Sequence, residues 1–116
     1  MDKKEVEVEN KWKLGKGEKG TFSDLKILVK LEKKSSLRRG KNIENTDENL
    51  LKEIENQLLK NWIRSYEKDG VFLAITIIHV GCDNERRKYA IENSVNGAMH
   101  KALPKIGIVP PQIFAL

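Results

Sequence analysis

The chain contains a single cysteine among its 116 residues, so it cannot form an intramolecular disulfide framework. This scarcity is typical of proteins in reducing compartments and favours a cytoplasmic location. The longest apolar run, residues 71–80, covers ten residues, whereas a membrane-spanning helix needs about 20. The first residues are charged and have no apolar stretch behind them, so we expect neither a secretory signal nor a membrane partner.

Aromatic residues are also scarce, at 6% of the sequence, and there are only three prolines. Hydrophobic residues make up 39% of the chain and charged residues 34%, a balance typical of a globular domain with a heavily charged surface. The length fits one domain, residues 1–116, with one modest core that needs no metal or disulfide to fold. We expect no cofactor.

Positive charge is concentrated in one part of the chain. Residues 1–10 carry a net charge of −2 and residues 42–116 a net charge of −1. Residues 11–41 contain eleven basic and three acidic residues, a net charge of +8. Because this segment holds all the excess charge, its field is expected to attract polyanions.

The N-terminal part of the chain has the pattern of a β-hairpin. Polar and apolar residues alternate over 5–14 and again over 21–32, which predicts two half-buried strands. Residues 15–20 between them contain three glycines and predict a reversal of the chain. Residues 33–41 are polar and basic, and they predict a loop.

Two helices and one central strand are predicted for the rest. Apolar residues at three- and four-residue spacing predict a helix near 46–68, capped by Asn45 or Thr46 and ended by a glycine. Residues 71–80 are apolar at nearly every position, which indicates a central strand covered on both faces.

The second helix is predicted near 84–103, where Pro104 should stop it. Residues 106–109 leave room for a short last strand. These elements give an α+β two-layer sandwich in the order β-β-α-β-α, with the N-terminal antiparallel hairpin in a mixed sheet. The strand–helix–strand passage over 21–80 predicts that the second and third strands run parallel.

The candidate nucleic-acid-binding residues are the basic residues of segment 11–41. They lie on the solvent face of the predicted hairpin and in its loops, where they could neutralise a phosphate backbone. Equally, lysines on a sheet can serve as a solvated face that discourages aggregation. The candidates are Lys11, Lys13, Lys16, Lys19, Lys26, Lys30, Lys33, Lys34, Arg38, Arg39 and Lys41.

Other motifs are weaker. The glycines of 15–20 lack the G-x-x-x-x-G-K-[ST] spacing of a nucleotide-binding loop. His79, Cys82 and Asp83 follow one another where the apolar strand ends, and a Cys–His pair there could act as nucleophile and base. As metal ligands His79 and Cys82 lack a second pair, so no metal site is expected.

Three functional hypotheses follow. The first is a small non-enzymatic protein that binds nucleic acid, DNA or RNA, non-specifically through residues 11–41, as a homo-oligomer. The second is a structural assembly component, of a virion or another multi-subunit particle, that makes subunit contacts through strand 71–80 and the apolar tail 106–116. The third is a cysteine-dependent enzyme around His79, Cys82 and Asp83, although the sequence favours a non-enzymatic role.

Overall fold

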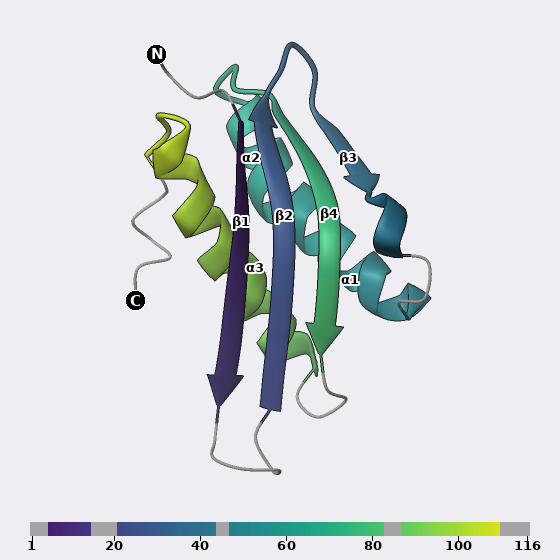
Figure 1. Cartoon of the computed structure of the whole chain (residues 1–116). Coiled ribbons are helices and arrows are strands. Elements are labelled where there is room, and N and C mark those ends of the chain that lie inside the picture. The colour runs from purple at the N-terminus through teal and green to yellow at the C-terminus, as the bar shows by residue number, and fades with distance from the viewer. Residues whose placement is uncertain (1–4, 15–20, 44–46, 83–86, 110–116) are drawn as a thin grey trace.

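A computed structural model of the chain describes residues 5–14, 21–43, 47–82 and 87–109. It has one four-stranded sheet in the order β1-β2-β4-β3, with helices packed against one face (Figure 1). The predicted α+β class, with an N-terminal hairpin in a mixed sheet, is confirmed.

The hairpin forms because each of its two alternating strands has an apolar face, and both strands bury that face. β1 (Glu5–Leu14) pairs antiparallel with β2 (Thr21–Leu31), and Val8 stands opposite Ile27. Both of these side chains are buried in the core against the helices. The polar residues of the alternation therefore lie on the other face of the sheet, which we call the open face.

A short third strand was missed by the sequence patterns. β3 (Ser36–Arg39) pairs in parallel with β4 (Leu73–Cys82), so the prediction of a loop over 33–41 is wrong. Four residues with one apolar side chain, Leu37, are too few to show a period of two. Instead, backbone pairing defines the strand, and it continues beyond β3 in a 2.7 Å bond from Gly40 N to Ile77 O.

This strand also changes the topology that we expected. β4 lies between β2 and β3 and pairs antiparallel with β2. The prediction that the second and third strands run parallel is therefore wrong. The chain reverses between β2 and β3, so the crossover through the helices joins β3 to β4, and that pair is the parallel one.

The first helical region is one continuous helix with a π-helical turn inside it. α1 (Glu48–Leu58), the π-helix η3 (Leu59–Ile63) and α2 (Arg64–Glu67) follow one another without a break. A 3-10 turn, η2 (Lys41–Ile43), precedes them. The cap is Asp47, whose carboxylate accepts a 2.9 Å hydrogen bond from Asn49 N, one residue beyond the predicted positions. Asn45 and Thr46 lie outside the described residues.

The π-turn coincides with the largest side chain of the core. Trp62 is fully buried, and its Nε1 donates a 3.3 Å hydrogen bond to Asn96 Oδ1 on α3 (Arg87–Lys105). His100, one turn further along α3, meets the Trp62 ring edge to face at 5.7 Å between ring centres. These contacts join the two helical regions.

The end of α3 differs from the prediction. Pro104 lies inside the last turn and does not stop the helix, which runs to Lys105. Gly107, with a φ of +84°, then reverses the chain, and Ile108 N bonds to Leu103 O at 2.9 Å. The predicted short strand 106–109 is therefore wrong, because these residues form the helix's closing turn.

The two faces of β4 have different surroundings. Leu73, Ile75 and Ile77 are buried beneath the helices, whereas Thr76 and Ile78 on the open face are half-buried. β4 is an interior strand, as predicted. Within one chain, however, the described helices cover only one of its faces (Figure 1), so cover of the second face by a partner subunit stays a prediction.

Candidate nucleic-acid interface

The hairpin lysines lie on the open face, but they are not alone there. Register brings the acidic residues of β1 beside the lysines of the hairpin. Two ion pairs across the hairpin result, Lys30 Nζ to Glu5 Oε2 at 3.4 Å and Lys26 Nζ to Glu7 Oε2 at 3.5 Å. A third lies within β1, from Lys11 Nζ to Glu9 Oε1 at 3.5 Å. Charges separated in the sequence thus cancel across the hairpin. These lysines add little net positive field to the open face.

Arg39 is held by the first helix. Its guanidinium donates to both oxygens of Glu48 at 2.7 and 2.8 Å, and to both oxygens of Glu55 at 3.3 and 2.8 Å. Hydrogen bonding to Glu48 and then to Glu55 raises the pKa of Arg39, and the guanidinium lowers the pKa of Glu48. The charged guanidinium of Arg39 therefore links β3 to α1.

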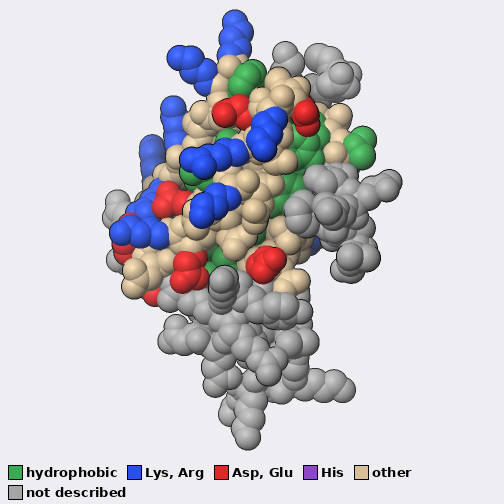
Figure 2. Space-filling model, turned by 180° about the vertical axis from the view of Figure 1, so that it is seen from behind, with side chains coloured by type: hydrophobic (Ala, Val, Ile, Leu, Met, Phe, Trp, Pro, Cys, Tyr) green, Lys and Arg blue, Asp and Glu red, His purple; other side chains and the backbone are tan. Residues whose placement is uncertain are grey.

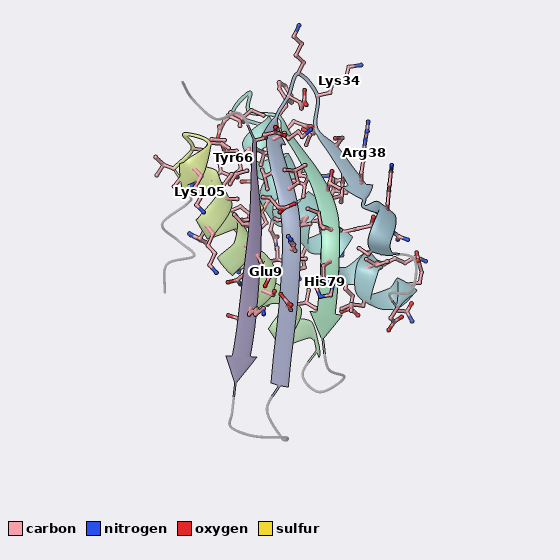
Figure 3. The ribbon with its side chains drawn as sticks, viewed as in Figure 1. Glu9, Lys34, Arg38, Tyr66, His79 and Lys105 are labelled. Atoms are coloured by element: carbon pink, nitrogen blue, oxygen red, sulfur yellow. The ribbon has the colours of Figure 1, made fainter. Side chains whose placement is uncertain are left out.

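Of the remaining described cations of the segment, Lys33 and Lys34 lie in the turn from β2 to β3, Arg38 lies on β3, and Lys41 begins η2 beyond it. Lys33, Lys34, Arg38 and Lys41 are exposed, and within the part of the chain that the structure describes none makes an ion pair. Figure 3 shows Lys34 at the tip of the turn and Arg38 on β3 close by, at the same end of the sheet. Seen from the helix side, basic side chains stand out along this edge of the molecule (Figure 2).

A groove lies among these residues on the open face. Its volume is about 500 Å³, and we call it the β2–β3 groove. Its lining contains four cations, one carboxylate, two serines and two small side chains of β4: Lys30, Glu32, Lys33, Lys34, Ser35, Ser36, Arg38, Ala74 and Thr76. The charge of this lining is net positive, in contrast to the hairpin face.

Ser35 is the residue of this groove that the sequence patterns missed. Its Oγ is buried and has no hydrogen-bond partner among the described residues. A buried hydroxyl without a partner is costly, so this group favours any hydrogen-bond partner that it can reach by turning into the groove. The only sequence signal was its position directly after two lysines, in a segment that we interpreted as a loop.

The described cations of the basic segment do not form one surface. β2 has eleven residues and spans about 35 Å at the usual rise per residue. Lys11 pairs with Asp24 near the start of β2, whereas Lys33 and Lys34 follow its last residue, Leu31, at the other end. Lys16 and Lys19 lie outside the described residues, as does the side chain of Lys13.

His79 lies on the open face because of a β-bulge. Ile27 pairs with Ile77 and Lys26 with His79, so Ile78 is the extra residue and the alternation reverses after it. His79 is 58% exposed, and its Nε2 lies 3.6 Å from Asp24 Oδ2. One oxygen of Asp24, Oδ1, is buried without a partner in the described structure.

The hypothesis of a cysteine-dependent site remains a prediction. Cys82 is the last residue of β4, its side chain is not described, and Asp83 lies outside the described residues. The described part of the chain contains no group of three or more histidine, cysteine or acidic side chains placed to hold a metal ion. None of the described helices is long and apolar enough to cross a membrane.

The sequence matches no protein-family model and no curated protein. The fold does match solved structures, among them the crystal structure of ttk003000868 from Thermus thermophilus, with a TM-score of 0.62. The match covers 90% of this chain at 16% identity, but only 16% of that much longer protein. It therefore supports the fold and carries no information on activity.

Proposed function

We propose that the protein binds nucleic acid through the phosphate backbone, without reading base sequence, and that the β2–β3 groove makes the principal contacts. The observation that carries this proposal is the set of cations around the groove that have no acidic partner in the described structure: Lys33, Lys34 and Arg38. Cations already paired within the protein must lose a partner before they bind phosphate. Unpaired cations lose only water and counterions.

The chemistry of the groove supports a phosphate ligand in a second way. The Ser35 hydroxyl, buried without a partner in the described structure, can donate to a phosphate oxygen by turning into the groove, while the lysines and Arg38 supply charge. No aromatic side chain lines the groove, so stacking on bases has no platform there. Backbone contact without base readout is the binding mode that this combination favours.

The proposal ranks the eleven candidate residues by their expected contribution to nucleic-acid binding. Lys33, Lys34, Arg38 and Lys41 are expected to contribute most. Lys11, Lys26 and Lys30 are expected to contribute less because each already has a carboxylate partner. Lys13, Lys16 and Lys19 would form a separate contact towards the hairpin turn. The single cysteine remains consistent with a cytoplasmic protein.

A salt titration of binding tests the proposal. Affinity for a random-sequence duplex should fall as salt rises, because phosphate neutralisation releases counterions. The triple variant Lys33→Gln/Lys34→Gln/Arg38→Gln removes three contacts, which should flatten the slope of log affinity against log salt by about 2.7. Lys52→Gln/Lys60→Gln/Lys68→Gln is the matched control, with the same loss of charge at exposed positions of the helical layer.

The outcomes of this experiment distinguish the possible locations of the nucleic-acid-binding site. The control should leave the slope within a few tenths of the wild-type value. Equal flattening by both triple variants would mean that net charge alone attracts the nucleic acid. An unchanged slope in the groove variant, with a flatter one in Lys16→Gln/Lys19→Gln, would place binding at the hairpin turn. Absence of binding at low salt would contradict the function itself.

A second candidate function is assembly with other subunits, and the open face of β4 favours it. Thr76 and Ile78 are only half-buried, and no described helix covers them. The tail gives less support: Ile106 packs into the core of its own domain, and residues 110–116 lie outside the described residues. The finding that would favour this function is a stable oligomer that buries the open face and binds no nucleic acid.

A further inference from the structure

β1 is an edge strand whose charges change sign along its length. Within the described structure only β2 pairs with it, so its outer side is open to another strand. Its open-face residues are acidic in the first half, Glu5, Glu7 and Glu9, and basic at Lys11, and the sequence has lysine again at position 13. Exposed edge strands usually carry charge that repels a second copy. A strand that is acidic at one end and basic at the other repels a parallel copy but attracts an antiparallel one.

We infer that two copies of this chain associate through their β1 strands, antiparallel and centred on Asn10, to form a continuous eight-stranded sheet. Residues on opposing strands then share a face when their numbers have the same parity. With Asn10 opposite Asn10 of the second copy, Glu9 lies opposite Lys11 and Glu7 lies opposite position 13, which is lysine. Directly opposed charges of unlike sign stabilise a strand pair.

The charge pattern selects this register over its neighbours. A slip of two residues in one direction sets Glu9 of each copy opposite Glu9 of the other. A slip in the opposite direction sets Lys11 opposite Lys11. The register centred on Asn10 opposes only unlike charges between positions 7 and 13, so it is the one that the sequence of β1 favours.

The surroundings of β1 provide competition for such a partner, because the C-terminal half of α3 passes to the outer side of this strand (Figure 1). A hollow lined by Glu5, Val6, Glu7 and Lys105 lies beside the strand. Lys101 Nζ on α3 donates a 3.2 Å hydrogen bond to the backbone carbonyl of Glu9, and Lys11 pairs with its own Glu9. A second strand must displace these contacts of exposed side chains, so we expect a dimer that dissociates on dilution and not a permanent one.

Charge reversal on the full-length chain tests the pairing by sedimentation over a range of concentrations. Lys11→Glu alone and Glu9→Lys alone each place like charges opposite one another twice in the dimer, and each should weaken association by about tenfold or more. The double variant Glu9→Lys/Lys11→Glu restores unlike pairs and should return association to near the wild-type level. Lys26→Glu, on β2 of the same face, should weaken association much less.

Cysteine cross-linking tests the register independently of folding stability. In a Cys82→Ser background, a mixture of Glu7→Cys and Lys13→Cys chains, which keep Glu9 and Lys11, should form a mixed disulfide dimer on mild oxidation. A mixed disulfide between Glu5→Cys and Lys13→Cys chains would instead reveal the register with Glu9 opposite Glu9. That result, a chain that stays monomeric at all concentrations, or a dimer indifferent to the charge reversals would each overturn the inference. None of these results bears on nucleic-acid binding by the groove.

Discussion

Asn10 on β1 and Ser94 on α3 are bound to each other twice across the interface between sheet and helix. Asn10 Nδ2 donates to the Ser94 carbonyl at 3.1 Å, and Ser94 Oγ donates to the Asn10 carbonyl at 3.5 Å. Both side chains are buried among apolar neighbours. Because buried polar groups are costly unless paired, this reciprocal contact fixes where α3 crosses β1.

The glycine of α3 makes room for this contact. A Cβ atom on Gly97 would overlap the side-chain amide of Asn10. We therefore expect Gly97→Ala to lower the free energy of unfolding by about 1–2 kcal/mol, even though alanine is the better helix former by about 1 kcal/mol. Urea denaturation measures the change. Glu92→Ala, at an exposed position of the same helix, is the control and should change stability by less than about 0.5 kcal/mol.

The same contact predicts coupling between the two positions. Asn10→Ala should cost about 1–2 kcal/mol because it removes the buried hydrogen bond from Nδ2. In the double variant Asn10→Ala/Gly97→Ala, the new methyl group of residue 97 occupies space that the amide has left. The two costs should therefore sum to more than the cost of the double variant, by about 1 kcal/mol. Strict additivity would show that Gly97 is required for another reason.

The cluster of Arg39, Glu48 and Glu55 predicts a pH dependence of stability. Arg39 lowers the pKa of Glu48 in the folded state, so folding favours the ionised carboxylate. Its contribution to stability is present above the unfolded pKa of a glutamate and is lost as pH falls through the folded pKa. The stability difference between wild type and Arg39→Met should therefore shrink as pH is lowered from 7 to acid. Denaturant titrations at several pH values measure it, and a difference that stays constant would contradict the assignment.

The raised pKa of Tyr66 predicts that part of the folding stability is lost at high pH. Burial, and secondly the Asp69 carboxylate, raise the pKa of this phenol, whose hydroxyl donates a 3.1 Å bond to the Val109 carbonyl. Folding favours the neutral phenol, so this contribution is present below the unfolded pKa and is lost as pH rises through the folded pKa. Phenolate absorbance should show a titration step above the ordinary range of tyrosine. In Tyr66→Phe the higher step should disappear, and its persistence would assign that step to Tyr89.

The fold was predictable where a pattern extends over many residues. Alternation over 5–14 and 21–32 was sufficient to predict β1 and β2, and the apolar spacing after Asp47 was sufficient to predict the first helical region. β3 was not predictable in this way, because a strand of four residues is defined by its partner β4 and not by its own pattern. One missed strand then reversed the expected direction of β2 relative to β4.

The candidate site, like the fold, could be predicted from the sequence only in part. Counting charge along the chain identified a basic segment, but it could not show which cations already have partners. Arg38 and Arg39 are adjacent in the sequence and have the same chemistry, yet only Arg39 reaches α1. Likewise, the acidic residues of β1 belong to a separate acidic stretch of the sequence, and only the register of the hairpin brings them beside Lys26 and Lys30.

These adjacent arginines give the sharpest test of the proposed function. Arg38 lines the β2–β3 groove and has no ion pair in the described structure, whereas the guanidinium of Arg39 is held by two glutamates. Arg38→Gln should weaken binding to duplexes of any sequence and reduce the salt slope by about 0.9, the contribution of one phosphate. Its stability should change by less than about 0.5 kcal/mol, because an exposed side chain without a partner is removed.

Arg39→Gln changes the net charge by the same amount one residue away, and it should behave in the opposite manner. It removes the link between β3 and α1, so the free energy of unfolding should fall, while the salt slope stays near the wild-type value. Fluorescence anisotropy at four or more salt concentrations, together with urea denaturation of each variant, measures both quantities. If the two variants flatten the slope equally, Arg39 contacts phosphate in spite of its ion pairs. Pairing within the protein then cannot be used to rank the other basic residues.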